Sequence, residues 1–305
     1  MKFGITAATI SNDYADAWAS QPYQCVNYAS CHDNLTLYDR LKTECPNATE
    51  EELIAMNKMA AAMTYTSQGI PFMLSGEEFA RTKVNADGTL NENSYNASDS
   101  VNEMKWSRKE QYSDLYEYYK GMIALRANHK AFRMSTTEDI ANNLKYIDVQ
   151  DSNVIAYTLN GSAVGDKWNT IAVLFNSNDA EVSVTLPSEN WVAVVNGEAA
   201  GTKALETINA SVVTIPAKSS YVLVDKASYE AALLDEDNKD ASDTSKDEVS
   251  SDASNDKDKS SEANKATNKK TGDDNNFVAF AIASLVSALC LCTAYSYNRK
   301  KQRQN

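Results

Sequence analysis

Residues 26–34 read VNYASCHDN, and this stretch sets the expected fold of the chain. A short β-prone run ends in small residues, and an imidazole, a carboxylate and an amide follow at His32, Asp33 and Asn34. If residues 25–29 form a buried strand, these three side chains lie at its carboxyl end, where (β/α) barrels carry out their chemistry. A His-Asp pair at a solvated strand end also arises by chance, so the dipeptide alone is only a hypothesis.

Two further segments with a distinctive pattern follow in the first third of the chain. Residues 69–83 read GIPFMLSGEEFARTK, and residues 93–102 read NSYNASDSVN, with WSRK following at 106–109. Together with VNYASCHDNLTLYDRL at 26–41, they resemble the α-amylase superfamily of glycoside hydrolases (family 13), in the form carried by type I pullulanases. Three blocks in family order make this a specific signal.

The resemblance implies a retaining hydrolase that cleaves α-1,6-glucosidic bonds in pullulan, starch or glycogen on a (β/α)8 barrel. It implies that Asp33 is the catalytic carboxylate that stabilises the transition state, and that His32 binds the same sugar. Asn34 is a further residue that we predict to bind substrate. Hydrogen bonds to sugar hydroxyls that strengthen in the transition state supply several kcal/mol. No redox or organic cofactor is implied, no metal ligands are assigned, and nothing in the sequence supports a calcium site.

Retaining glycosidases also need a nucleophilic carboxylate and a general acid about 5 Å apart. In this superfamily both lie on strands that precede the His-Asp region. Residues 1–24 contain no Glu, and their only carboxylates, Asp13 and Asp16, do not match the Arg-x-Asp pattern of the family nucleophile. We therefore expect the C-terminal portion of a pullulanase-like enzyme that is inactive alone. The alternative is a non-catalytic, surface-displayed fragment that binds α-glucan.

The segment after the second block is rich in amide, hydroxyl and carboxylate groups. Such groups suit a polyhydroxylated ligand, and an aromatic ring covers the apolar face of a sugar. The residues predicted to bind substrate here are Arg81, Asn93, Tyr95, Asp99 and Asn102. The competing interpretation is a polar loop whose side chains bond its own backbone. For Glu77 and Glu78 we expect a structural or substrate-positioning role.

The periodicity predicts an α/β part followed by an all-β part. Residues 1–135 are expected to form the last two βα units of the barrel, with a capping box at Thr49 and Glu52 that starts a helix. From about residue 140 short strands alternate with turn-forming residues, which predicts a C-terminal β-sandwich at 136–226. The predicted strands are 144–149, 154–159, 170–176, 181–186, 191–195, 212–215 and 220–224.

The C-terminal quarter has a different composition. Residues 227–276 are rich in Ser, Asp and Lys and predict a disordered linker. Residues 277–297 form an apolar run long enough to span a bilayer, and the basic tail 298–305 predicts a cytoplasmic C-terminus. The region resembles a Gram-positive sorting signal, with Thr271–Gly272 as the bond cut by sortase, although Asn268 and Lys269 replace the usual Leu and Pro. A retained membrane anchor is the alternative, and either one predicts an extracellular globular part at the cell surface.

The charge of the chain restricts its partners. The 305 residues carry a formal net charge of -13, and the pI is about 4.7. Nucleic acid and anionic lipid attract basic surfaces, so nucleic acid is not an expected partner. A neutral α-glucan imposes no charge requirement. The five cysteines fit no common zinc spacing and predict free thiols.

Overall fold

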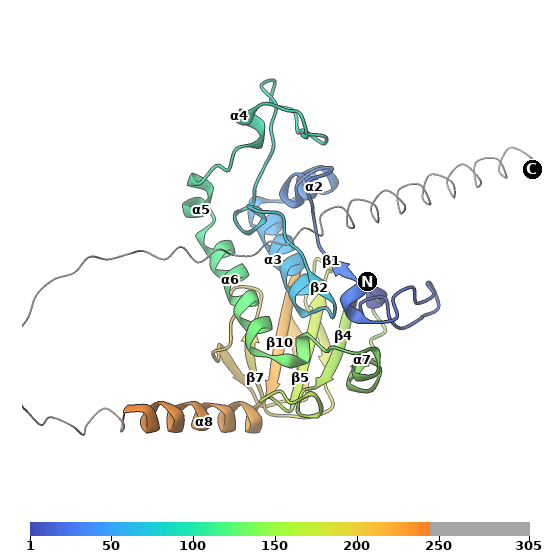
Figure 1. The fold of residues 1–305 in the computed structure, drawn as a ribbon, viewed down its shortest axis with the longest axis vertical. Coiled ribbons are helices and arrows are strands. Elements are labelled where there is room, and N and C mark those ends of the chain that lie inside the picture. The colour runs from blue at the N-terminus through green and yellow to red at the C-terminus, as the bar shows by residue number, and fades with distance from the viewer. Residues whose placement is uncertain (245–305) are drawn as a thin grey trace, which may run out of the picture. The chain divides into compact units, whose positions relative to one another are not determined.

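The computed structural model describes residues 1–244, with side chains described to residue 235 (Figure 1). The predicted transmembrane helix 277–297, the tail 298–305, the Thr271–Gly272 bond and most of the predicted linker lie outside the described residues and stay predictions. None of the described helices is both long and apolar enough to cross a membrane.

The first half of the described chain is mainly helical. Its elements are α1 (Lys2–Ile5), η1 (Pro22–Gln24), β1 (Val26–Asn27), α2 (Leu37–Glu44), α3 (Glu50–Thr66), β2 (Ile70–Pro71), η2 (Glu77–Phe79), α4 (Asp99–Asn102), α5 (Ser107–Gln111), α6 (Ser113–Asn128), η3 (Lys130–Phe132) and α7 (Thr137–Asn143). The second half is mainly strand. Its elements are β3 (Leu144–Tyr146), β4 (Val154–Asn160), η4 (Ser162–Val164), β5 (Thr170–Asn176), β6 (Val182–Thr185), β7 (Trp191–Val195), β8 (Glu206–Ile208), β9 (Val212–Ile215), β10 (Ser219–Asp225) and α8 (Lys226–Thr244).

The strands β1 and β2 form a parallel pair, with Val26 opposite Ile70, and α2 and α3 connect them. Parallel neighbours require such a crossover connection. The pair is one βαβ unit, and both strands are shorter than the sequence predicts. The described residues do not establish a barrel wall, so a partial (β/α)8 barrel stays a prediction.

Helix α3 begins at the predicted capping box. The Thr49 side chain accepts a hydrogen bond from the Glu52 amide, and the Glu52 side chain accepts one from the Thr49 amide. The other end is capped by the buried Arg126, whose guanidinium donates to the carbonyl oxygens of Tyr65, Ser67, Gly69 and Phe132 at 2.6–3.0 Å. Burial lowers the pKa of Arg126 to about 10, which leaves the side chain charged at neutral pH.

The all-β part contains a six-stranded antiparallel sheet in the order β3-β4-β5-β10-β7-β8. A second sheet, the antiparallel pair β6-β9, covers one face of it. Alternation along β5 separates the two faces. Ala172 and Leu174 pack toward β6-β9, while Ile171 and Val173 belong to the core shared with the helices. Each predicted strand of this part has a counterpart, and β8 is an addition.

The helices cover the other face of the six-stranded sheet, so residues on both sides of position 135 share one hydrophobic core (Figure 1). The closest approach is at Gly121 of α6, where an added Cβ would lie 1.9 Å from the Ala200 carbonyl oxygen. Helix α8 follows β10 and occupies the first part of the predicted disordered linker. It is ordered there because Tyr229 and Ala232 are buried in the shared core, so the sequence prediction is wrong for this stretch.

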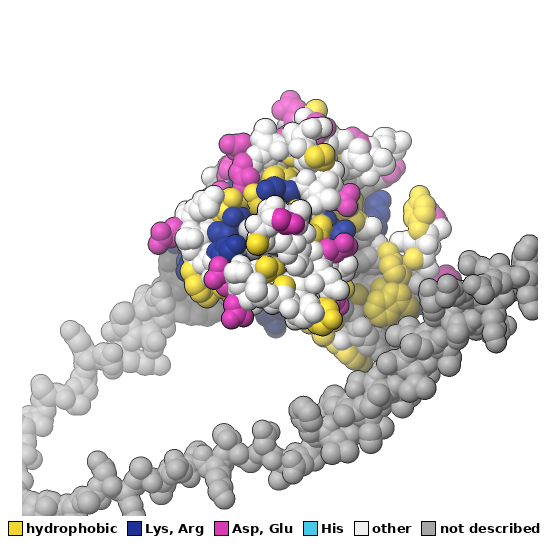
Figure 2. All heavy atoms as spheres, turned by 90° about the horizontal axis from the view of Figure 1, so that it is seen from above, with side chains coloured by type: hydrophobic (Ala, Val, Ile, Leu, Met, Phe, Trp, Pro, Cys, Tyr) yellow, Lys and Arg dark blue, Asp and Glu magenta, His cyan; other side chains and the backbone are white. Residues whose placement is uncertain are grey.

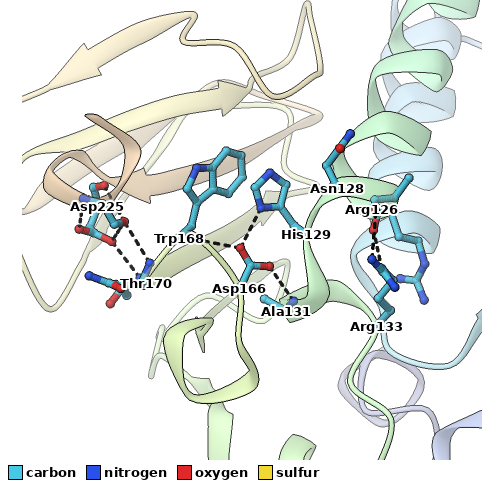
Figure 3. A network of polar contacts seen from close by, with 12 residues as sticks. Arg126, Asn128, His129, Ala131, Arg133, Asp166, Trp168, Thr170 and Asp225 are labelled. Carbon is cyan, nitrogen blue, oxygen red and sulfur yellow. Dashed lines mark hydrogen bonds and ion pairs between the residues drawn. The ribbon is translucent and has the colours of Figure 1, made fainter. Parts of the chain in front are cut away.

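A buried polar cluster joins the end of α6 to the segment before β5 (Figure 3). His129 and Asp166 point toward each other, and the His129 ring stacks on Trp168 with centroids 3.4 Å apart. His129 is the C-cap residue of α6 and is completely buried, and Trp168 and Trp191 are buried as well.

Candidate functional site

His32, Asp33 and Asn34 form an exposed turn between β1 and α2. The side chains of His32 and Asp33 are 82% and 67% exposed, and His32 Nε2 lies 3.6 Å from Asp33 Oδ2. Asn34 has a positive φ of 63°, a conformation that Asn adopts more readily than most residues. The turn follows the carboxyl end of a parallel strand, and its polar side chains are therefore accessible to a ligand.

An open depression of about 520 Å³ lies beside this turn. It is lined by Asp33, Asn34, Glu92 and Asn93, so the structure brings together residues from the first and third sequence blocks. Carboxylate oxygens accept hydrogen bonds and amide groups both donate and accept them, which suits sugar hydroxyls. Glu92 was not predicted from the sequence. Its position next to Asn93 is the only signal that pointed to it.

The start of the turn is held from below by the buried Glu77. Ser30 Oγ donates a hydrogen bond to Glu77 Oε2, and Tyr119 OH lies 3.1 Å from Glu77 Oε1. Burial raises the pKa of Glu77 to about 7, and the hydrogen bonds from Ser30 and Tyr119 limit that rise. The neighbouring Glu78 instead accepts a hydrogen bond from the Gly76 amide at 2.8 Å. Both carboxylates thus have the structural or positioning contacts that were expected.

The far end of the turn is tied to the third block through Asp39 of α2. Asp39 is buried, and its two carboxylate oxygens accept hydrogen bonds from the Thr82 hydroxyl and the Lys83 amide. Lys83 Nζ in turn donates to Ser94 Oγ at 2.6 Å, next to Asn93. Burial lowers the pKa of Lys83. These contacts fix both walls of the depression relative to each other.

Arg81 and Asn102 brace the loop and do not line the depression. Arg81 donates to the Ser75 and Asn102 carbonyl oxygens, and Asn102 Nδ2 donates to the Ser94 carbonyl oxygen at 2.7 Å. These side chains bond the backbone of their own loop, as the competing interpretation of this segment expects. Their role toward a ligand stays a prediction.

Tyr95 and Asp99 are exposed on the same loop and line no part of the depression. Tyr95 is 80% exposed, and Asp99 begins α4. Figure 2 looks onto the end of the described fold that carries α4, and it shows mainly backbone and uncharged polar side chains, with hydrophobic groups and scattered charges of both signs between them. No group of three or more His, Cys, Asp or Glu side chains within residues 1–235 is arranged to hold a metal ion. Cys25, Cys31 and Cys45 are free thiols.

Comparison with known proteins shows which class of enzymes the chain resembles. The described chain is similar to starch-debranching glycoside hydrolases, both pullulanases and isoamylases. Residues 140–199 match the family model for the all-β domain of pullulanase. The chain is 34% identical over 169 residues to the pullulanase of Bacillus subtilis, an alignment that covers 55% of this chain and 23% of that protein.

Solved structures extend the similarity beyond the all-β domain. A pullulanase from Bacillus acidopullulyticus superposes with a TM-score of 0.67 and 39% identity, over 73% of this chain and 26% of that one. A pullulanase from Anoxybacillus complexed with maltotetraose gives 0.63 and 31%, over 73% and 30%. The chain is thus pullulanase-like, and it spans about a quarter to a third of the length of these relatives.

Proposed function

We propose that this chain is the C-terminal portion of a pullulanase-like glycoside hydrolase that cleaves α-1,6-glucosidic bonds in pullulan, starch or glycogen. The observation that supports it best is the exposed Asp33, which follows a parallel strand and lines an open polar depression together with Asn93. In this proposal a glucose ring of the substrate occupies that depression.

The chemistry assigned to each residue follows from its donors and acceptors. Asp33 accepts hydrogen bonds from two ring hydroxyls, and these bonds strengthen as positive charge develops at the sugar in the transition state. His32, whose side chain is beside Asp33, binds a hydroxyl of the same ring. Asn34 and Asn93 supply amide groups on either side of the ring. Asp33 is therefore a stabilising carboxylate, and neither the nucleophile nor the acid.

The carboxylates that line the depression are Asp33 and Glu92. Retaining hydrolysis needs a nucleophile and a general acid in addition to a stabilising carboxylate. We therefore propose that the 305-residue chain does not hydrolyse glucan alone. Related pullulanases have been solved in complex with maltose and with maltotetraose, and this supports an α-glucan as the ligand.

A second candidate function is non-catalytic α-glucan binding. It is favoured by the exposure of the His32–Asp33 turn, because an open polar depression can bind a sugar without any reacting group beside it. The two functions predict different activities toward pullulan when this chain is joined to the remainder of a pullulanase.

A chimaera distinguishes them. Residues 1–225 would replace the matching segment of the Bacillus acidopullulyticus pullulanase, and release of reducing ends from pullulan would be measured. We expect an active chimaera, a loss of about 100-fold or more in kcat for Asp33→Asn, and little change for the control Asp13→Asn. A folded but inactive chimaera that still binds maltotetraose would favour the binding function. Pullulan turnover by the 305-residue chain alone would contradict the proposed inactivity.

We also propose that the chain is anchored at the cell surface, with its globular part outside. The support is the sequence alone: the apolar run 277–297, the basic tail, and Thr271–Gly272 as a sortase site. Fractionation of producing cells tests this, with full-length protein in the membrane fraction for a membrane anchor and wall-linked protein cleaved after Thr271 for a sortase substrate. Protein that is released by neither detergent nor wall hydrolase treatment, but is found free in the cytosol, would contradict the anchor.

A further inference from the structure

Glu77 is a buried carboxyl group that takes no part in the role proposed for Asp33. It is 5% exposed and begins η2, in the segment that follows β2, while its partner Ser30 lies in the segment that follows β1. Ser30 is two residues before His32. The Ser30–Glu77 hydrogen bond therefore joins the segments that follow the two parallel strands, next to the turn that carries the candidate site.

Tyr119 connects Glu77 to a third buried side chain. Tyr119 OH lies 2.8 Å from Asn57 Oδ1 and 3.1 Å from Glu77 Oε1. Asn57 belongs to α3 and Glu77 to η2. A phenol has one hydrogen to donate. If Tyr119 donates it to Asn57, the second contact needs a hydrogen from Glu77, which only the neutral carboxyl can supply.

The ionised carboxylate requires another arrangement. Tyr119 must then donate to Glu77, and Asn57 Oδ1 loses its donor. Asn57 Nδ2 is buried without a hydrogen-bond partner among the described residues, so a rotation of the amide would let Nδ2 donate to the Tyr119 oxygen. The buried network thus has two hydrogen-bonding arrangements that differ by one proton on Glu77, and each leaves one amide atom of Asn57 without a partner among the described residues.

We propose that Glu77 is the positioning residue of the Asp33 site, because its carboxyl group holds Ser30 and thereby fixes the turn that carries His32 and Asp33. The role of the turn in glucan binding rests on the proposed function. The link from Glu77 to the turn does not, since it depends only on the contacts of Ser30.

The strength of the Ser30–Glu77 hydrogen bond depends on whether Glu77 is protonated. A carboxylate accepts a stronger hydrogen bond from Ser30 than a neutral acid does, so the turn is held more firmly when Glu77 is ionised. The titratable groups that face it are Glu78 from η2, Tyr119 from α6 and Tyr65 from α3, with Arg126 beyond Tyr65. Burial and the charge of Glu78 both raise the pKa of Glu77, and the network changes state near neutral pH.

The test follows the backbone amide signals of residues 31–34 by NMR from pH 5 to 9 in the 305-residue chain. The variant His32→Gln serves as the background, because it removes the titration of the imidazole itself. We expect these signals to shift with a midpoint near pH 7. Glu77→Gln removes the carboxyl and should abolish the inflection. Ser30→Ala keeps the carboxyl and should also abolish it at residues 31–34, because the link is cut.

Glu78→Gln is the matched control, since Glu78 is adjacent and bonds Gly76 but not Ser30. It should keep the inflection and move it to lower pH, because the charge of Glu78 raises the pKa of Glu77. An inflection that persists in both Glu77→Gln and Ser30→Ala would overturn the inference, and so would amides in residues 31–34 that do not respond to pH in the background chain.

Maltotetraose binding, measured at pH 6 and pH 8 in the chain with His32 restored, separates this inference from the proposed function. Tighter binding at pH 8 with a pH dependence that becomes smaller in Glu77→Gln supports both. Absence of binding together with the expected amide inflections contradicts the proposed function and leaves the positioning role supported. Binding with equal pH dependence in Glu77→Gln overturns the positioning role.

Discussion

His129 Nδ1 lies 2.9 Å from Asp166 Oδ1, and neither side chain exposes any surface to solvent. Asp166 also accepts hydrogen bonds from the amides of Ala131 and Trp168, at 2.9 and 3.0 Å. One carboxylate thus joins the end of α6, η3 and the segment that leads into β5 (Figure 3). The cluster connects the helical part to the all-β part, and none of its residues lines the depression beside Asp33.

The variant Asp166→Asn should lower the free energy of unfolding by about 2–4 kcal/mol at pH 7, because an amide nitrogen would replace one acceptor and leave a buried donor unpaired. The change in the free energy of unfolding is measured from the urea concentration at the midpoint of unfolding. Asp148→Asn, at an exposed position, is the control and should change the free energy by less than about 0.5 kcal/mol. An unchanged midpoint for Asp166→Asn would contradict the structural role of the cluster.

Acid should remove the stabilisation that Asp166 gives to this cluster. Burial acts to raise the pKa of Asp166, but the hydrogen bonds from His129, Trp168 and Ala131 outweigh it and hold the pKa below its ordinary value of 3.8. A lowered folded-state pKa stabilises the protein above pH 3.8, and that stabilisation is lost as the pH falls through the folded-state value. The difference in stability between the wild type and Asp166→Asn should therefore shrink below pH 4.

Much of the all-β part could be predicted from the sequence. Most of the strands from β3 to β10 are short runs rich in apolar and β-branched residues that lie between turn-formers, as in β5 and β7, and this pattern predicts strands directly. The strand β8 was not predicted, because Glu206–Ile208 is short and mostly exposed, so its residues show no buried face. Helix α8 was mistaken for linker because its composition is polar, and of its side chains up to residue 235 only Tyr229 and Ala232 reach the core.

The candidate site was predictable only in part. Asp33 and Asn93 stand in segments with a family resemblance, whereas Glu92 was identified by its place in the fold. The Ser30–Glu77 contact joins residues 47 positions apart and His129–Asp166 joins residues 37 apart. Local patterns carry no information on such pairs, because tertiary packing decides which buried polar groups meet.

Glu77 should make the free energy of unfolding fall as the pH rises, which is opposite to the effect of Asp166. Its pKa is about 7 in the folded chain against an ordinary value of 4.5. A raised carboxyl pKa means that the stabilisation is fully present below pH 4.5 and is lost as the pH rises to about 7. The free energy of unfolding of the wild type should therefore fall by about 3 kcal/mol over this interval relative to Glu77→Gln. Urea titrations at a series of pH values measure it, and parallel curves would contradict it.

Gly121→Ala tests the packing of α6 on the sheet. Alanine favours helix by about 1 kcal/mol over glycine, but its Cβ would lie 1.9 Å from the Ala200 carbonyl oxygen. Overpacking costs about 1–3 kcal/mol or more, so the clash should win and the thermal midpoint should fall. Gly201→Ala, whose added Cβ has no neighbour closer than 4.0 Å, should leave the midpoint nearly unchanged. A higher midpoint for Gly121→Ala would show that the two elements do not approach this closely.

The central claim is that the depression beside Asp33 binds an α-glucan. An NMR titration of the 305-residue chain with maltotetraose tests it most directly. We predict amide shifts at Asp33, Asn34 and Asn93, with affinity reduced about 10-fold or more by Asp33→Ala and unchanged by Asp13→Ala. Shifts confined to another surface, or an affinity that does not depend on Asp33, would contradict the account.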